Sequence, residues 1–309
     1  MIEHNPPAYL AIVGPTASGK SRLALAIASE MDGEIVNCDS IQFYRGFDIG
    51  SAKPTLEERA HIPHHGIDLF SWREIFDASQ YQKFAREEIA EIAGRGKLPI
   101  VVGGSGLYFR ALVGDRFDDL PSNPMLRGSL QQNHSAKELY EKLQKVDPTR
   151  AKEIHPNDEF RTLRALEVVL TGGKSFAACI QDSRQAPFPP ACTLYLQPDK
   201  ALLETQIQTR VENMLRENWI HEVRGLLQEG CPLSAIPMSS IGYKQMAAYI
   251  HGTLSEAELA AEIFTATRRY AKKQRTWFRQ VKSDLHLRTV SFSTWKQYLL
   301  PLISEKLQR

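Results

Sequence analysis

Short apolar runs alternate with segments of helical periodicity in the first hundred residues. Residues 9–13, 34–38 and 98–102 are mostly apolar, and their length predicts buried strands. Between them, apolar positions recur at helical spacing in residues 22–31 and 78–92. Because strands and helices alternate, the pattern predicts a parallel sheet with helices on its faces.

The middle of the chain has a different pattern. Residues 121–191 are rich in helical periodicity interrupted by prolines and glycines, and a further strand is predicted at residues 193–196. Helical patterns then continue to the C-terminus. We therefore predict an α/β fold with a catalytic core, residues 1–120 and 192–309, interrupted by a smaller helical insertion domain, residues 121–191.

Composition narrows the class of protein but not its function. With 42% hydrophobic and 24% charged residues, the chain has the composition of a soluble globular protein. No apolar stretch reaches the ~18 residues of a membrane span, and no signal-like segment precedes the first predicted strand. We expect a cytoplasmic protein with no membrane partner, and nothing requires more than a monomer. The widely spaced cysteines argue against a disulfide framework or a structural zinc site.

A phosphate-binding loop lies between the first predicted strand and the first predicted helix. It matches G-x-x-x-x-G-K-[ST] at every fixed position, which makes the core a P-loop core. Its backbone N–H groups and the helix N-terminus favour an anion, Lys20 adds a positive charge, and the Ser21 hydroxyl can bind Mg²⁺. The loop alone does not distinguish a nucleotide such as ATP from a diphosphate leaving group. Its residues are Gly14, Pro15, Thr16, Ala17, Ser18, Gly19, Lys20 and Ser21.

Asp39 ends the second predicted strand, so it is expected at the carboxyl edge of the sheet beside the phosphate loop. From its position alone, Asp39 is either a catalytic base or the magnesium-binding carboxylate of an ordinary nucleotide hydrolase. The third predicted strand runs into Gly103, Gly104 and Ser105, with no acidic residue at its end. That absence weakens the interpretation of the chain as a P-loop kinase or hydrolase, because such an enzyme usually carries a second acidic magnesium site.

Several segments, in chain order, resemble the signature of bacterial tRNA dimethylallyltransferases. They are G-P-T-A-S-G-K in the loop, D-S-I-Q-F-Y at 39–44, D-I-G-S-A-K-P at 48–54, H-H-G-I-D at 64–68, G-G-S-G-L-Y at 103–108, R-A-L-E at 164–167, I-G-Y-K-Q at 241–245, and residues 267–279. This series spans almost the whole chain and is far more specific than a phosphate loop. Ser105 replaces the family's usual threonine and Gln245 stands where glutamate is common, but neither change removes a group on which the chemistry depends.

The resemblance implies a reaction and its participants. A dimethylallyl group passes from dimethylallyl diphosphate to the exocyclic N6 amine of the adenine 3′ to the anticodon, with Mg²⁺ as cofactor and the tRNA anticodon stem-loop as partner. Asp39 is the implied base, and Arg210 and Thr16 are the other implied catalytic residues, while the phosphate loop binds the diphosphate. The insertion domain contacts tRNA. The implied RNA contacts are Asp39, Ser40, Ile41, Gln42, Ser105, Phe160, Arg161, Thr162, Leu163, Arg164, Gly242, Tyr243 and Lys244.

A long basic helix is predicted near the C-terminus. Ser255 and Glu258 form a capping box that opens it. Residues 268–282 contain seven lysines and arginines and no acid, and several of them fall on one helical face. The net charge of +2 does not indicate a nucleic acid, but this concentration of charge does. Trp277 and Phe278, within the helix, are predicted to pack in the core.

Three other functions remain open at this point. A P-loop kinase or nucleotide hydrolase would transfer a phosphoryl group or hydrolyse a nucleotide. A prenyltransferase acting on a free adenine nucleotide would share the loop and the base, but would have little use for the insertion or the basic helix. A non-catalytic RNA-binding protein would not need an intact phosphate loop beside Asp39.

Overall fold

The computed structural model describes residues 6–114, 120–182, 186–288 and 295–308. The chain forms two compact units, Met1–Leu112 with Pro189–Arg309, and Val113–Phe188. The second unit overlaps the insertion that we predict at residues 121–191, but it begins earlier and ends slightly earlier. Each unit has its own hydrophobic core and is described by itself.

The first unit is built on a sheet of six parallel strands in the order β3-β2-β4-β1-β5-β6. The predicted parallel sheet flanked by helices is therefore confirmed. The strands β1, β2 and β5 are buried along their whole length, which explains why they appear as mostly apolar runs instead of alternating patterns. The strands are β1 (Leu10–Val13), β2 (Gly33–Asn37), β3 (His64–His65), β4 (Leu98–Gly103), β5 (Cys192–Leu196) and β6 (Leu285–Leu287).

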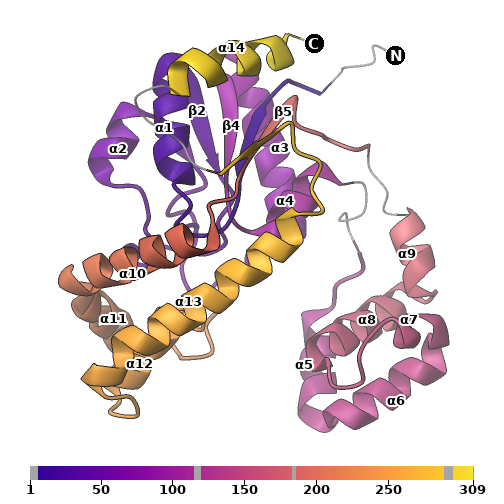
Figure 1. Cartoon of the computed structure of the whole chain (residues 1–309). Coiled ribbons are helices and arrows are strands. Elements are labelled where there is room, and N and C mark those ends of the chain that lie inside the picture. The colour runs from indigo at the N-terminus through magenta and orange to yellow at the C-terminus, as the bar shows by residue number, and fades with distance from the viewer. Residues whose placement is uncertain (1–5, 115–119, 183–185, 289–294, 309) are drawn as a thin grey trace. The chain divides into compact units, whose positions relative to one another are not determined.

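Helices cover both faces of this sheet (Figure 1). The helices α1 (Lys20–Glu30) and α14 (Trp295–Leu307) contribute apolar side chains to one shared core on one face. The helices α3 (Ala78–Gly94) and α4 (Gly106–Val113) lie on the other face. The short helix α2 (Leu56–His61) follows a capping box. The phosphate loop is thus held between a buried strand and a packed helix.

Four further helices complete the first unit at the carboxyl ends of the strands. Figure 1 shows α10 and α13 lying side by side there. At the start of α13 the N–H of Ser255 donates to the Glu258 carboxylate at 3.1 Å, as the capping box predicts. Phe278 is buried, and Trp277 is partly buried against Gly106, so the predicted core packing is confirmed. The helices are α10 (Lys200–Arg216), α11 (Trp219–Gln228), α12 (Tyr243–Ile250) and α13 (Glu256–Phe278).

The second unit is helical throughout its described residues. Its core surrounds the buried carboxylate of Glu167, which accepts the Asn123 N–H at 2.8 Å and Nη1 of Arg164 at 2.7 Å. Burial alone would raise the pKa of Glu167, but the hydrogen bonds from Arg164 and Asn123 outweigh it and leave the pKa lowered. The helices are α5 (Pro124–Asn133), α6 (Ala136–Val146), α7 (Pro148–Lys152), α8 (Glu159–Gly172) and α9 (Phe176–Asp182). No helix in the described part of the chain is long and apolar enough to span a membrane.

Candidate functional site

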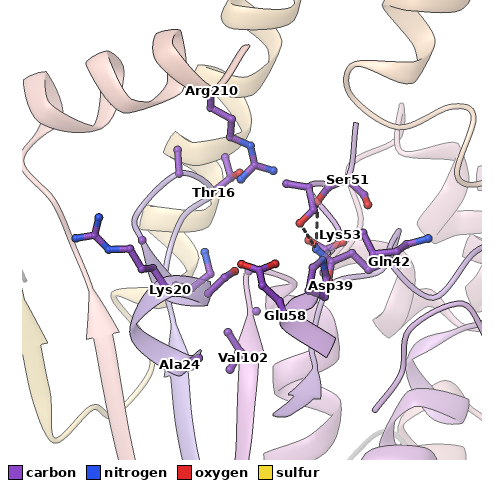
Figure 2. A pocket seen from close by; sticks show the side chains of 18 of the residues that line it. Thr16, Lys20, Ala24, Asp39, Gln42, Ser51, Lys53, Glu58, Val102 and Arg210 are labelled. Carbon is purple, nitrogen blue, oxygen red and sulfur yellow. Dashed lines mark hydrogen bonds between the residues drawn. The ribbon is translucent and has the colours of Figure 1, made fainter. Parts of the chain in front are cut away.

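A cavity of about 880 Å³ opens at the carboxyl edge of the sheet in the first unit. The phosphate loop forms one wall, and the segments that follow β2 and β4 form another. The helices α10 and α13 close the cavity with side chains that are distant in sequence (Figure 2). Residues predicted separately as base, cations and phosphate ligands therefore line a single space.

The phosphate loop depends on unusual backbone angles. Gly14 has a φ of +150°, and a Cβ atom at this position would lie 2.4 Å from the carbonyl oxygen of Leu196, so only glycine fits. Ala17 and Gly19 also have positive φ angles, of 61° and 86°. The helix α1 then begins directly at Lys20, so the first N–H groups of the helix have no partner within it. This geometry suits a phosphate group at the helix N-terminus.

Two cations face the cavity from different elements, Lys20 from α1 and Arg210 from α10. Lys20 is buried, and its Nζ donates to the carbonyl oxygen of Pro15 at 2.7 Å. Burial lowers the pKa of Lys20 to about 7, and the charge of Arg210 lowers it further, whereas Asp39 opposes the shift. Burial likewise lowers the pKa of Arg210. Within the described part of the chain, neither cation has a carboxylate partner within 4.0 Å, so an anion bound here would stabilise both.

Asp39 lies directly after β2, where the sequence predicts it. Its Oδ1 accepts the N–H of Ile41 at 2.9 Å, and its own N–H donates to Oδ1 of Asn37 at 2.9 Å. Asn37 is in turn anchored by donating to the carbonyl oxygen of Gly66 at 2.9 Å. The other carboxylate oxygen of Asp39 has no hydrogen bond to any described residue. One oxygen therefore orients the side chain, and the second is available to accept a proton.

The end of β4 leaves no room for an acidic side chain. A Cβ atom at Gly103 would lie 2.0 Å from the carbonyl oxygen of Cys38, and one at Gly104 would lie 2.4 Å from Nε2 of Gln274. Backbone therefore occupies the position where a second acidic magnesium ligand of a phosphate-transferring enzyme would be expected. The sequence shows that no acidic residue follows β4, and the close packing at Gly103 and Gly104 is the physical reason.

A second pair of cations lines the cavity but is already neutralised. The ammonium group of Lys53 contacts Asp48 at 2.5 Å and Asp68 at 2.6 Å, and its side chain is 1% exposed. Arg59 contacts the other oxygen of Asp68 at 2.7 Å. Burial alone would raise the pKa of Asp68, but the hydrogen bonds from Lys53 and Arg59 outweigh it and leave the pKa lowered. The ion pairs of Lys53 and Arg59 with Asp48 and Asp68 stabilise the wall of the cavity.

The predicted RNA contacts next to Asp39 lie at the cavity or close to it. Ser40, Ile41, Gln42 and Ser105 are each partly exposed. The side-chain amide of Gln42 lines the cavity and donates to the carbonyl oxygen of Ser51 at 3.1 Å. These residues stay predicted contacts, because the geometry allows an RNA base to reach them.

The predicted contacts at the start of α12 stay predictions, but they differ in exposure. Tyr243 is fully buried and its hydroxyl donates to the Glu222 carboxylate at 2.5 Å. Gly242 lies under the ring of Trp219, where a Cβ atom would be only 2.3 Å from the indole. Neither residue presents a side chain to a partner, because both pack against α11. Only Lys244 in this trio is exposed.

The predicted contacts in α8 of the second unit also divide into two groups. Phe160 is 77% exposed and Arg161 is exposed, so both stay predicted RNA contacts. Thr162 and Leu163 are buried, so their side chains are turned away from solvent, and their RNA contact stays a prediction. The guanidinium of Arg164 is held by the buried carboxylate of this unit and also donates to a backbone carbonyl at 3.2 Å.

Gln274 and Tyr270 are cavity residues that the sequence did not reveal. Both lie on α13, one helical turn apart, on the side that faces the phosphate loop. The sequence signals were their spacing within a helix recognised for its basic residues and their place in the segment 267–279 that resembles the family. Tyr270 is 39% exposed; its partial burial raises the pKa of its hydroxyl, and the negative charge of Asp39 raises it further.

Known proteins resemble this chain over most of its length. The family described as IPP transferase matches residues 42–281. A tRNA dimethylallyltransferase of Geobacter metallireducens is 42% identical over 284 residues, which are 91% of this chain and 92% of that protein. The full-length tRNA isopentenylpyrophosphate transferase of Bacillus halodurans superposes with a TM-score of 0.70 at 34% identity and covers 97% of each chain. A eukaryotic dimethylallyltransferase solved acting on tRNA has a TM-score of 0.81 at 26% identity, over 96% of this chain and 77% of that one.

Proposed function

The chain belongs to the IPP transferase family, and we propose that, as a tRNA prenyltransferase, it transfers a dimethylallyl group from dimethylallyl diphosphate to tRNA. The acceptor is the N6 amine of the adenine 3′ to the anticodon, and the second product is diphosphate. The proposal rests on one observation: Asp39, Lys20 and Arg210 line the same cavity, and one carboxylate oxygen of Asp39 is free of hydrogen bonds to the described residues.

This arrangement meets the two needs of the reaction. The lone pair of an adenine amine is delocalised into the ring, so the amine is a poor nucleophile unless a base takes its proton. An allylic diphosphate is a good electrophile when the charge on its departing oxygens is neutralised. In the proposed step the N6 nitrogen bonds to C1 of the allyl group while the C1–O bond breaks. The free oxygen of Asp39 takes the N6 proton, and the diphosphate keeps the bonding electrons and stays on the phosphate loop beside Lys20 and Arg210.

The cavity also has an apolar part suited to the dimethylallyl group. Ala24, Ile35 and Val102 line it and are buried, and Figure 2 shows Ala24 and Val102 together at one end of the cavity. Apolar walls bind the hydrocarbon and keep water, the competing acceptor, away from the activated carbon. The prenyl group would therefore lie against apolar side chains and the diphosphate against the phosphate loop.

Mg²⁺ is the proposed cofactor, and the oxygen donors beside the phosphate loop suit it. The Ser21 hydroxyl is exposed next to the phosphate loop, while the described residues contain no cluster of three or more His, Cys, Asp or Glu side chains able to hold a metal ion. Such a donor set suits an ion bound mainly by substrate phosphate oxygens and water, which is the usual coordination of Mg²⁺. When bound, Mg²⁺ would add positive charge beside the departing oxygens, and Ser21 would be its ligand from this chain.

The anticodon loop is the proposed RNA partner because its bases can leave the stack at low cost. A base inside a duplex could not reach the carboxylate of Asp39, whereas an unstacked loop base can enter a cavity. The exposed lysines and arginines of α13 supply charge for the phosphodiester backbone. Phe160 and Arg161 of the second unit are further proposed contacts. We infer a cytoplasmic location from the tRNA substrate, and the monomeric state stays a prediction.

Label transfer from radioactive dimethylallyl diphosphate tests the function directly. Wild type, Asp39→Ala and Asp39→Asn are incubated with Mg²⁺ and unmodified tRNA, with AMP and ATP as rival acceptors in parallel reactions. We expect label in tRNA alone, reduced about 10²–10⁴-fold in both variants because the base is lost. Asparagine keeps the oxygen that accepts the Ile41 N–H, so this variant should melt like wild type. Label in AMP alone would identify a free-nucleotide enzyme, and ATP turnover without prenyl transfer would identify a kinase.

A further inference from the structure

The helix α13 has two chemically different faces. Arg269, Lys272 and Lys273 are exposed to solvent. Ala271 and Gln274 are buried, as is the end of the helix at Phe278. A glutamine on the buried face of a basic helix requires hydrogen-bond partners inside the protein, because an unpaired buried amide is costly.

Those partners are the two loops that build the cavity. Oε1 of Gln274 accepts the N–H of Thr16 in the phosphate loop at 2.8 Å. Its Nε2 donates to the carbonyl oxygen of Gly104, after β4, at 2.8 Å. The side chain is 6% exposed, and the absence of a side chain at Gly104 is what allows this close approach. One amide thus joins three segments that are far apart in the sequence.

The contact to Thr16 constrains the part of the loop that matters for phosphate. Thr16 lies between the strained glycine at the start of the loop and Lys20, and it lines the cavity. With its N–H held by Gln274, its peptide plane cannot rotate, and the neighbouring N–H groups keep their direction. Tyr270, one turn earlier on the same helix, lines the same cavity. The buried face of α13 is therefore part of the cavity wall, while its opposite face is a basic surface.

We propose that Gln274 is a positioning residue that holds the phosphate loop in its diphosphate-binding form and fastens it to the basic helix. RNA on the exposed face of α13 and diphosphate in the loop then bind cooperatively, because each favours the same placement of the helix. The RNA part rests on the proposed function. The effect on diphosphate binding does not, because it can be measured without prenyl transfer.

Calorimetric titration with inorganic diphosphate tests this, with and without tRNA, on wild type and Gln274→Met. Methionine keeps the buried volume but offers neither hydrogen bond. We expect diphosphate to bind about tenfold more weakly to the variant, the effect of one net hydrogen bond. We expect tRNA to tighten diphosphate binding about fivefold or more in wild type and to lose this effect in the variant.

Gln82→Met is the matched control. Gln82 is a buried glutamine of α3, 1% exposed, that does not line the cavity, and its amide atoms have no hydrogen-bond partner among the described residues. Replacing it removes the same group from the interior of the same unit. Its affinity for diphosphate and its response to tRNA should match wild type.

Gln274→Glu separates positioning from simple packing and serves if the methionine variant does not fold. A glutamate accepts the Thr16 N–H in either ionisation state but donates to Gly104 only when protonated. At a pH low enough to protonate it, its diphosphate affinity should therefore exceed that of Gln274→Met at the same pH and approach that of wild type. Relief of charge repulsion alone, with residue 274 only filling space, would bring it no higher than the methionine variant. An unchanged dissociation constant in Gln274→Met, or an undiminished effect of tRNA, overturns the proposal. If wild type binds diphosphate but transfers no label, the proposed function fails while these differences still decide the role of Gln274.

Discussion

The two pairs of cations that line the cavity differ in what surrounds them. Lys53 and Arg59 each contact a carboxylate, and Lys53 contacts two. Lys20 and Arg210 have no such partner among the described residues, and each has a lowered pKa because burial disfavours its charge. Positive charge that is already neutralised stabilises the wall. Positive charge that is left buried and unpaired destabilises the empty protein and marks the place where an anion binds.

The difference follows from where each pair lies in the fold. The phosphate loop is built from glycine and small residues that carry no carboxylate, and Asp39, whose charge acts on Lys20, is oriented by backbone and Asn37. The segment around Lys53 instead contains Asp48, and a neighbouring turn brings Asp68. A lysine near a cavity is therefore not evidence for phosphate binding until its partners are known.

Among the changes that test this comparison of the two cation pairs, Lys20→Met has the largest expected effect. We expect diphosphate affinity and label transfer to fall by about 10²–10³-fold, the usual effect of removing one group that stabilises a developing anion. The melting temperature should be unchanged or higher, because the variant removes a buried charge that Arg210 repels. Calorimetric titration and thermal melting measure the two quantities. A large loss of stability with intact diphosphate binding would contradict the comparison.

Lys53→Met should have the opposite profile. Removing Lys53 leaves Asp68 with Arg59 alone and leaves Asp48, whose side chain is 57% exposed, to be screened by solvent. We therefore expect a loss of about 1–2 kcal/mol of unfolding free energy, less than the cost of breaking a fully buried pair. Diphosphate affinity should stay close to that of wild type. Urea unfolding at constant pH gives the stability change, and Lys53→Met with Asp68→Asn should recover part of it. An unchanged unfolding midpoint would show that this pair is not structural.

The smallest expected effect is proton uptake when diphosphate binds. Lys20 has a pKa of about 7 in the free protein, so it is mostly neutral at pH 8, and a bound anion favours its charged form. Binding should therefore take up close to one proton at pH 8, and affinity should fall up to about tenfold per pH unit above 7. Below pH 7 this lysine should contribute no further pH dependence.

Calorimetry in buffers of different ionisation enthalpy measures the uptake. Lys20→Arg is its control, because a guanidinium stays charged and the ionisation of the ligand affects both proteins equally. Equal uptake in both proteins would rule out Lys20 as the group that takes up the proton.

The fold was largely predictable because its signals are local. Buried parallel strands appear as apolar runs, the phosphate loop has a defined spacing, and the basic helix begins at a capping box. The edge strands β3 and β6 were not predicted, since two and three residues are too few to form a pattern. The RNA contacts stay predictions, and the structure adds only which of them are exposed. Thr162, Leu163 and Tyr243 are buried, and no local pattern in the sequence showed that.

By itself the sequence determined the phosphate loop, the place of Asp39 at a strand end and the alternation of the four longer strands with helical segments, because each depends on residues close together along the chain. Only the tertiary structure decided which cations are paired, which predicted contacts are buried, and that Gln274 joins the basic helix to the loop around Thr16. Those contacts link residues up to 258 positions apart. Their partners are set by how the helices pack against the sheet edge, and helical spacing alone does not specify what lies opposite a buried side chain.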